Sequence, residues 1–133
     1  MKYLTLVGLC LLIGACDPEK CTTHYLNNAT DKDLRIEFFP TITGSSLSNI
    51  SLPSGEQSKI AAGCALGSRT QINFASYDSI VVYEGQIPII NYTEGSSGDN
   101  IYRYENWTLK EENKNDYSYT FTITEADLAD AQD

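Results

Sequence analysis

Residues 117–123 constrain the fold of this chain more than any other segment, because they alternate strictly between bulky apolar and small polar side chains. The residues expected on one face are Tyr117, Tyr119, Phe121 and Ile123. The residues expected on the other face are Ser118, Thr120 and Thr122. Successive side chains of a β-strand point to opposite faces, so this period of two predicts a strand of an antiparallel sheet with one buried face.

Shorter runs of the same kind recur along the chain. Residues 34–38 alternate between apolar and polar side chains, and residues 50–52 do so briefly before a turn. Residues 79–90 predict a hairpin that turns at Glu84 and Gly85. The weaker candidates are short strands at 58–62 and 70–75, and a strand at 106–109 that would pair with 117–123 across a polar turn at 110–116.

Seven or eight short strands separated by turn residues are typical of an antiparallel β-sandwich, with a small barrel as the alternative. The core is expected to contain Ile36, Val81, Tyr117, Tyr119 and Phe121. Near the C-terminus, Thr124 followed by Asp127 resembles a helix capping box. The prediction is therefore an all-β single domain over residues 21–133, with a short C-terminal helix whose Leu128 contacts the body.

The N-terminus has a different character. Lys2 precedes an almost unbroken apolar run over residues 3–13. Helical residues rise about 1.5 Å each, so this run reaches roughly half-way across about 30 Å of hydrocarbon and fits the apolar region of a signal peptide instead of a membrane span. The small residues Gly14 and Ala15 then suit a peptidase cleavage site before Cys16.

Residues 13–16, Ile-Gly-Ala-Cys, resemble the lipobox of bacterial lipoproteins. The resemblance implies that residues 1–15 are a cleaved signal peptide, that Cys16 carries acyl chains such as palmitate, and that the protein is anchored in the membrane of the cell envelope. Residues 16–20 would then form a tether. The alternatives are an ordinary secretory signal or a buried N-terminal helix that contains Cys16.

The wider pattern is similar to that of small envelope lipoproteins of Bacteroidota, a group with no assigned activity. The shared features are the lipobox, the turn at 28–30, the strand start at 78–81 and a terminal Tyr-x-Phe-x-Ile-Thr-x-x-Asp element at 119–127. Asp17 and Glu19 resemble the acidic surface-export signal of that group, whereas aspartate directly after the lipidated cysteine favours inner-membrane retention in other envelopes. We expect the outer membrane, and the leaflet stays open.

The cysteines fit an oxidising compartment. If Cys10 leaves with the signal peptide and Cys16 carries lipid, Cys21 and Cys64 remain. We expect these two to form a disulfide, with two buried free thiols as the alternative. Removal of the signal peptide also takes away Lys2 and no acid, which changes the formal net charge from −9 to −10. Nucleic acids carry the same sign of charge, so they are not expected as partners.

Residues capable of catalysis are few. His24 is the single histidine, and we expect it to be a strand residue on a half-wet face. No Gly-x-Ser-x-Gly elbow, phosphate-binding loop or set of zinc ligands is visible, so the sequence assigns no catalytic residue, cofactor or metal. The acids fall mostly in turns and in the C-terminal tail, where surface solvation accounts for them.

Residues 91–107 form the most suggestive segment for binding. A flexible Gly-Ser-Ser-Gly stretch is flanked by aromatic residues, which stack on sugars or anchor protein partners. The candidate binding residues are Tyr92, Tyr102, Arg103, Tyr104 and Trp107. The alternative is that the tyrosines are core or sheet residues that lead into a strand. Glu94, Asp99 and Asn100 also offer oxygen ligands for calcium, but their spacing matches no EF-hand.

Residues 78–80, Asp-Ser-Ile, resemble the O-glycosylation site of Bacteroidota envelope proteins, which implies a glycan on Ser79. Together these features predict a lipid-anchored envelope protein with a non-enzymatic binding or structural role, and with a protein or a glycan as its partner. The alternatives are a small hydrolase that uses carboxylates and a periplasmic inhibitor or assembly factor.

Overall fold

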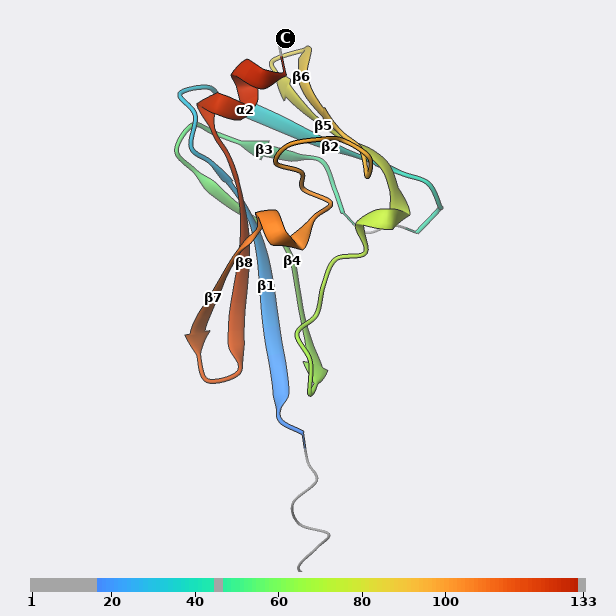
Figure 1. Ribbon diagram of the computed structural model, residues 1–133, viewed down its shortest axis with the longest axis vertical. Coiled ribbons are helices and arrows are strands. Elements are labelled where there is room, and N and C mark those ends of the chain that lie inside the picture. Colours follow the sequence, from blue (N-terminus) through green and yellow to red (C-terminus); the bar gives the residue numbers. More distant parts are fainter. Residues whose placement is uncertain (1–16, 45–46, 132–133) are drawn as a thin grey trace, which may run out of the picture.

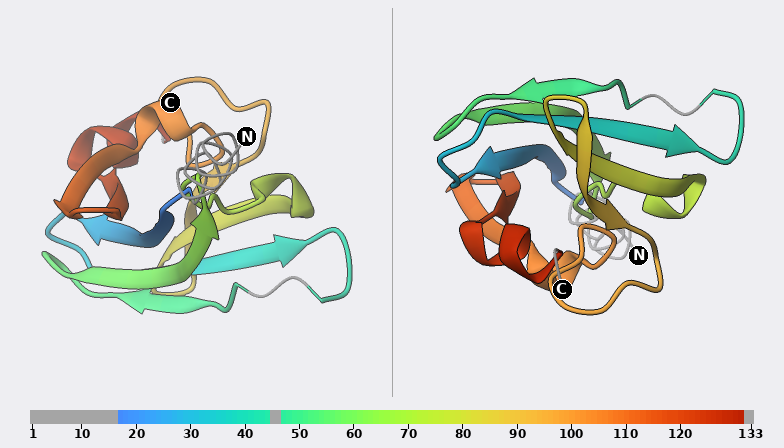
Figure 2. Two further views of the ribbon diagram at one scale, coloured as in Figure 1. Left: turned by 90° about the horizontal axis from the view of Figure 1, so that it is seen from below. Right: turned by 90° about the horizontal axis from the view of Figure 1, so that it is seen from above.

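The computed structural model describes residues 17–44 and 47–131, and these fold into two four-stranded sheets. The strands are β1 (Glu19–Asn28), β2 (Leu34–Pro40), β3 (Ile50–Leu52), β4 (Gln57–Leu66), β5 (Tyr77–Glu84), β6 (Ile87–Tyr92), β7 (Thr108–Asn113) and β8 (Asp116–Ile123). Sheet A has the order β4-β1-β8-β7, and sheet B has the order β3-β2-β5-β6. The two sheets form packed layers, so the predicted β-sandwich is confirmed (Figure 2).

Most strand pairs are antiparallel, as predicted, and sheet A contains one parallel pair. Strands β1 and β8 run parallel, from the pair of Cys21 with Asp116 to the pair of Asn28 with Ile123. The other neighbours in both sheets are antiparallel. Parallel strands need a long connection, and the whole domain lies between β1 and β8 in the chain. Sheet A also extends beyond sheet B toward the start of β1 (Figure 1).

The folded body begins inside the segment expected to be a tether. Strand β1 starts at Glu19, and the amide of Gly67 donates a hydrogen bond of 3.0 Å to the carbonyl of Pro18. At the other end of β1, Asn28 is the last strand residue instead of part of a turn. The predicted signal peptide and Cys16 lie outside the described residues.

Two members of the predicted core are placed differently. Ile80 and Val82 of β5 are buried, and Val81 is half-buried on the opposite face, which it shares with its pairing partner Glu37. Residues 80–82 are all apolar and show no alternation with polar residues, so the sequence could not show which of them face inward. Tyr117, the second residue of β8, is half-buried as well.

Two segments differ from their predicted secondary structure. Residues 70–73 form no strand, and the short 3-10 helix η1 (Phe74–Ser76) follows them. The segment crosses the inner face of sheet A, where the Thr70 amide donates to Thr22 Oγ1 at 3.2 Å. The predicted polar turn at 110–116 is mostly strand β7, because both faces of this edge strand are exposed and tolerate charge. The turn is confined to the end of the hairpin, where Asn115 has a φ of 67°.

The C-terminal helix α2 (Glu125–Asp130) is confirmed. Thr124 accepts a hydrogen bond from the Asp127 amide, and the Asp127 carboxylate accepts one from the Thr124 amide, so the capping box forms as predicted. Leu128 is buried against the body. No helix within residues 17–44 and 47–131 has the length and hydropathy that a membrane span requires.

Candidate functional site

The predicted disulfide is confirmed between Cys21 of β1 and Cys64 of β4. These residues are direct partners in the antiparallel register, and 43 positions separate them in the chain. The bond joins the edge strand β4 to the central strand β1 close to the N-terminal end of the fold.

His24 lies on the inner face of sheet A, three positions along β1 from the disulfide. Its ring stacks on Tyr119 of β8 with a centroid distance of 5.3 Å, and its partner in β4 is Ala61. The side chain is only 2% exposed, so the prediction of a half-wet face is wrong. Burial without a charged partner lowers the pKa of His24 to about 4, and the ring is therefore neutral at pH 7.

A hydrogen-bond relay joins His24 to Tyr104 and to the backbone at Ile72. The Ile72 amide donates to Tyr104 Oη at 2.6 Å, and the same oxygen lies 3.0 Å from His24 Nε2. The Tyr104 hydroxyl can donate its proton to Nε2 or accept one from it, so this contact forms in either tautomer of the imidazole. His24 Nδ1 is buried and has no hydrogen-bond partner among the described residues.

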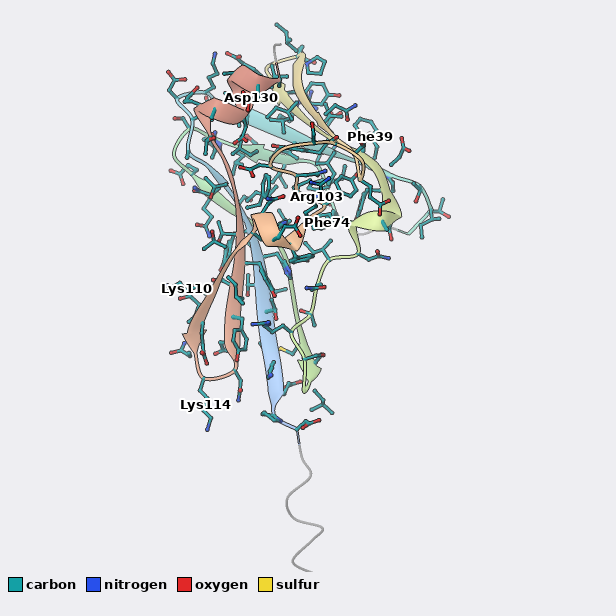
Figure 3. All side chains as sticks on the ribbon, viewed as in Figure 1. Phe39, Phe74, Arg103, Lys110, Lys114 and Asp130 are labelled. Carbon is teal, nitrogen blue, oxygen red and sulfur yellow. A yellow bond between two sulfur atoms is a disulfide. The ribbon has the colours of Figure 1, made fainter. Side chains whose placement is uncertain are left out.

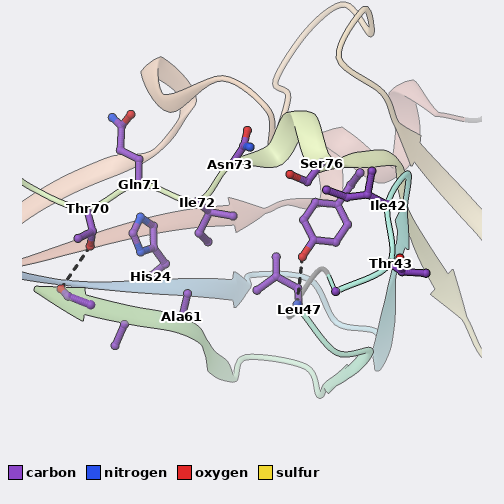
Figure 4. Close-up of a pocket in the computed structure, with 14 residues that line it drawn as sticks. His24, Ile42, Thr43, Leu47, Ala61, Thr70, Gln71, Ile72, Asn73 and Ser76 are labelled. Carbon is purple, nitrogen blue, oxygen red and sulfur yellow. Dashed lines mark hydrogen bonds between the residues drawn. The ribbon is translucent and has the colours of Figure 1, made fainter.

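A cavity of about 390 Å³ lies beside His24, between β4, the 70–76 segment and the β2–β3 connection (Figure 4). It exists because β4 turns Ala61 and Gly63 inward, and small side chains leave space over the sheet. Its apolar lining includes Ile42, Leu47 and Ile72. Its polar lining comes from Thr43, Thr70, Gln71, Asn73 and Ser76. None of the described lining residues is an acid, a lysine or an arginine.

The candidate binding residues of the 91–107 segment are mostly used inside the fold. Tyr92 and Trp107 are 4% and 5% exposed, so most of their surface packs inside the fold, and a binding role for the segment stays a prediction. Tyr102 donates to the Tyr77 carbonyl at 3.2 Å, and Tyr104 is engaged by His24. Arg103 donates to the Ser96 carbonyl at 3.1 Å. The tyrosines therefore follow the core alternative that the sequence left open.

Ser79 is half-buried in β5, directly opposite Phe39 of β2. Its neighbour Ile80 is buried, and adjacent strand residues point to opposite faces, so Ser79 lies on the outer face of sheet B. The glycan implied for Ser79 stays a prediction.

Sequence reasoning missed the cavity because its walls come from four separate segments. Two features of the sequence could have suggested the cavity. One is the pair of small residues Ala61 and Gly63 in a strand, and the other is His24, the single histidine, at a strand position that alternation places on the inner face. Within the described parts of the chain, no three His, Cys, Asp or Glu side chains gather in a way that could hold a metal ion. Comparisons of the chain with protein-family models, with curated proteins and with solved structures find no match.

Proposed function

We propose that the mature chain is a lipid-anchored envelope protein that binds a glycan without catalysis, by holding an uncharged sugar unit in the cavity beside His24. The observation that carries the proposal is the Nδ1 atom of His24, a residue that lines the cavity, because this buried atom has no hydrogen-bond partner among the described residues. A buried polar atom without a partner costs about 1–3 kcal/mol, and a ligand hydroxyl, which can both donate and accept, removes this cost in either tautomer of the ring.

The charge of the cavity supports an uncharged ligand. His24 is neutral at pH 7, and the described lining contains no ionised side chain. A carboxylate, phosphate or ammonium would lose its hydration there without gaining a charged partner, which is costly.

The mixture of polar and apolar side chains in the cavity lining supports a sugar as the ligand. The side chains of Gln71, Asn73 and Ser76 make no hydrogen bond with another described residue. They can therefore donate hydrogen bonds to the hydroxyl groups of a sugar and accept hydrogen bonds from them. Ile42, Leu47 and Ile72 offer apolar contact for the C–H face of a sugar ring. The volume of about 390 Å³ is within the usual range for small-molecule sites.

The same lining disfavours the hydrolase alternative at this cavity. Glycoside hydrolysis uses a pair of carboxylates that flank the scissile bond. Within the described residues the cavity offers no carboxylate, and His24 has a pKa too low for a general base near pH 7.

The anchoring part of the proposal is supported by sequence position. Glu19 begins β1 three residues after the lipobox cysteine, so lipid on Cys16 would hold this end of the sandwich close to a membrane. The lower end of β1 and the turn of the β7–β8 hairpin, with Lys114, lie at the same end of the molecule (Figure 3).

The test is an NMR titration of the purified mature protein in a zwitterionic detergent, with methyl N-acetylglucosaminide and methyl glucoside as neutral probes and methyl glucuronide as the charged control. We expect saturable shifts of the His24 ring signals with at least one neutral probe, and weaker binding of the glucuronide. Ala61→Leu fills the cavity and is expected to weaken binding about tenfold, equivalent to roughly 1.4 kcal/mol. Lys59→Leu, which adds the same side chain at an exposed β4 position, is the matched control.

Two results would contradict the proposal. One is the absence of any shift at His24 with both neutral sugars. The other is equal binding by the Ala61→Leu and Lys59→Leu variants, which would place the bound sugar elsewhere.

A further inference from the structure

A second cavity, of about 460 Å³, lies where β6, the 96–99 loop and α2 meet. Its lining residues are Ile89, Ile90, Asn91, Tyr92, Ser96, Ser97, Gly98, Asp99, Asp127, Asp130 and Ala131. Helix α2, which carries Asp130, lies beside β6 at the end of the molecule opposite the start of β1 (Figures 1 and 3). This acidic cavity is separate from the His24 cavity and shares none of its lining residues.

Three carboxylates line the acidic cavity, and no described lining residue is basic. Asp127 accepts the capping hydrogen bonds of Thr124 through Oδ2, and Asp99 accepts from Asn106 Nδ2 through Oδ1 at 3.3 Å. Asp127 Oδ1, Asp99 Oδ2 and both carboxylate oxygens of Asp130 make no hydrogen bond or ion pair with another described residue. The cavity therefore presents acceptors that are not yet used.

Tyr92 supplies an independent indication of a ligand. Its side chain is only 4% exposed, it lines the acidic cavity, and its Oη has no hydrogen-bond partner among the described residues. Burial raises the pKa of Tyr92, and the carboxylates of Asp127 and Asp99 raise it further, so the hydroxyl lies in the field of both charges and keeps its proton. A buried hydroxyl that lies in the field of two carboxylates, in the same cavity lining, suits a group that carries several hydrogen-bond donors.

The spacing of the acids argues against a bare metal ion. The three carboxylates line one cavity, yet they are not grouped closely enough to coordinate a metal among the described residues. The occupant must be a larger cation whose donors reach separate oxygens. Ile89, Ile90 and Ala131 provide an apolar wall beside the acids, which suits a methylene stem that ends in a charged head.

We propose that the acidic cavity binds the side chain of a lysine or arginine from a partner protein, with its stem on Ile89 and Ile90 and its cationic head among Asp99, Asp127, Asp130 and Tyr92 Oη. Free polyamines carry the same alkyl-ammonium groups, and the experiment below distinguishes a polyamine from the side chain of a partner protein. The site points away from the anchored end of the molecule, where a partner protein can approach it. The proposal does not depend on the function proposed for the His24 cavity.

The experiment is an NMR titration of the purified mature protein in zwitterionic detergent at low salt. The probes are the N-acetyl methylamides of lysine and arginine, with those of norleucine and citrulline as uncharged counterparts, and spermidine and Ca²⁺ as further arms. We expect the lysine or arginine amide to shift the amide signals of Gly98, Asp99 and Asp130, and the binding to weaken as salt is added. Preference for spermidine over both amides would assign the same chemistry to a free polyamine.

Variants test the individual contacts. Asp130→Asn removes an exposed carboxylate and is expected to weaken binding about two- to fivefold. Asp116→Asn, an exposed change at the start of β8, is the matched control and leaves binding unchanged. Tyr92→Phe is expected to weaken binding without lowering the stability of the free protein, because the hydroxyl it removes has no partner in the fold.

Three outcomes would overturn the proposal. Equal binding of the norleucine or citrulline amide would show that charge is not recognised. Tighter binding of Ca²⁺ than of either cationic amide, at the same residues, would assign a metal site instead. Unchanged affinity in both Asp130→Asn and Tyr92→Phe would place the cation elsewhere on the acidic surface.

Discussion

At the scale of single residues, His24 shows how an ordinary strand position acquires an unusual environment. The alternation of side chains along β1 places His24 on the inner face of the sheet, between Tyr119 and Ala61. The Tyr104 hydroxyl lies 3.0 Å from His24 Nε2. The aromatic neighbours exclude water, whereas the small residue in β4 leaves a cavity. The same histidine is therefore both a core residue and one of the polar residues that line the cavity.

The low pKa of His24 predicts a pH dependence of folding. In the unfolded chain the pKa is about 6.5, and in the folded protein it is about 4, so the unfolded state binds more protons between these values. Stability is complete above about pH 6.5 and falls as the pH drops toward 4. Between pH 7 and pH 5 the loss attributable to His24 is on the order of 2 kcal/mol.

Urea unfolding of the wild type and of His24→Phe at pH 7 and pH 5 measures this effect. The phenylalanine keeps an aromatic ring against Tyr119 and does not titrate, so the variant should lose less stability on acidification than the wild type does. Carboxylates titrate in both proteins, and the comparison removes their contribution. An equal loss in the two proteins would contradict a neutral, buried His24.

At the scale of secondary-structure elements, β1 organises the fold. It pairs with β4 on one side and with β8 on the other, so the first strand of the domain holds sheet A together. The Cys21–Cys64 bond reinforces one of these two pairings near the end of the sheet. Strand β4 is an edge strand, and covalent attachment limits its separation from β1 when the edge opens.

Loss of the disulfide is expected to destabilise the domain. For a loop closed across 43 positions, the chain-entropy account gives a stabilisation of about 4 kcal/mol. Reductant should therefore lower the urea midpoint of the wild type. The double variant Cys21→Ser with Cys64→Ser should unfold at that lower midpoint with or without reductant. A wild-type midpoint that does not respond to complete reduction would show that the bond contributes nothing to stability.

At the scale of the whole molecule, the two ends of the fold differ in chemistry. One end holds the start of β1 and the disulfide, and the opposite end holds α2, β6 and the acidic cavity (Figure 1). If lipid is attached at Cys16, the first end faces the membrane and the acidic cavity faces away from it. The two proposed sites would then be presented by a body whose orientation the anchor restricts.

Anchoring is tested by fractionation of cells that express variants of the full chain. Cys16→Ser should move the protein from the membrane fraction to the soluble fraction, because it removes the acylated thiol. Cys10→Ser is the matched control, since Cys10 is expected to leave with the signal peptide, and its product should stay in the membrane fraction. Retention of the Cys16→Ser protein in the membrane would contradict lipid attachment at this residue.

The sequence by itself determined the features that depend on local pattern. The alternation in residues 117–123 identified β8 and most of its buried face, because side-chain direction in a strand follows a period of two. The hairpin of β5 and β6 and the capping box at Thr124 and Asp127 were also predictable, since each is set by neighbouring residues. Cysteine arithmetic identified the disulfide partners.

Only the tertiary structure decided how these elements meet. The parallel pairing of β1 with β8 joins the two ends of the domain, and the inward choice of Ile80 and Val82 over Val81 depends on the sheet opposite. Residues 70–73 form no strand because the Thr70 amide and hydroxyl bond to sheet A, and the Ile72 amide bonds to Tyr104 Oη, instead of forming a ladder. Both cavities are assembled from segments far apart in the chain, and such meetings are set by packing, which no local period encodes.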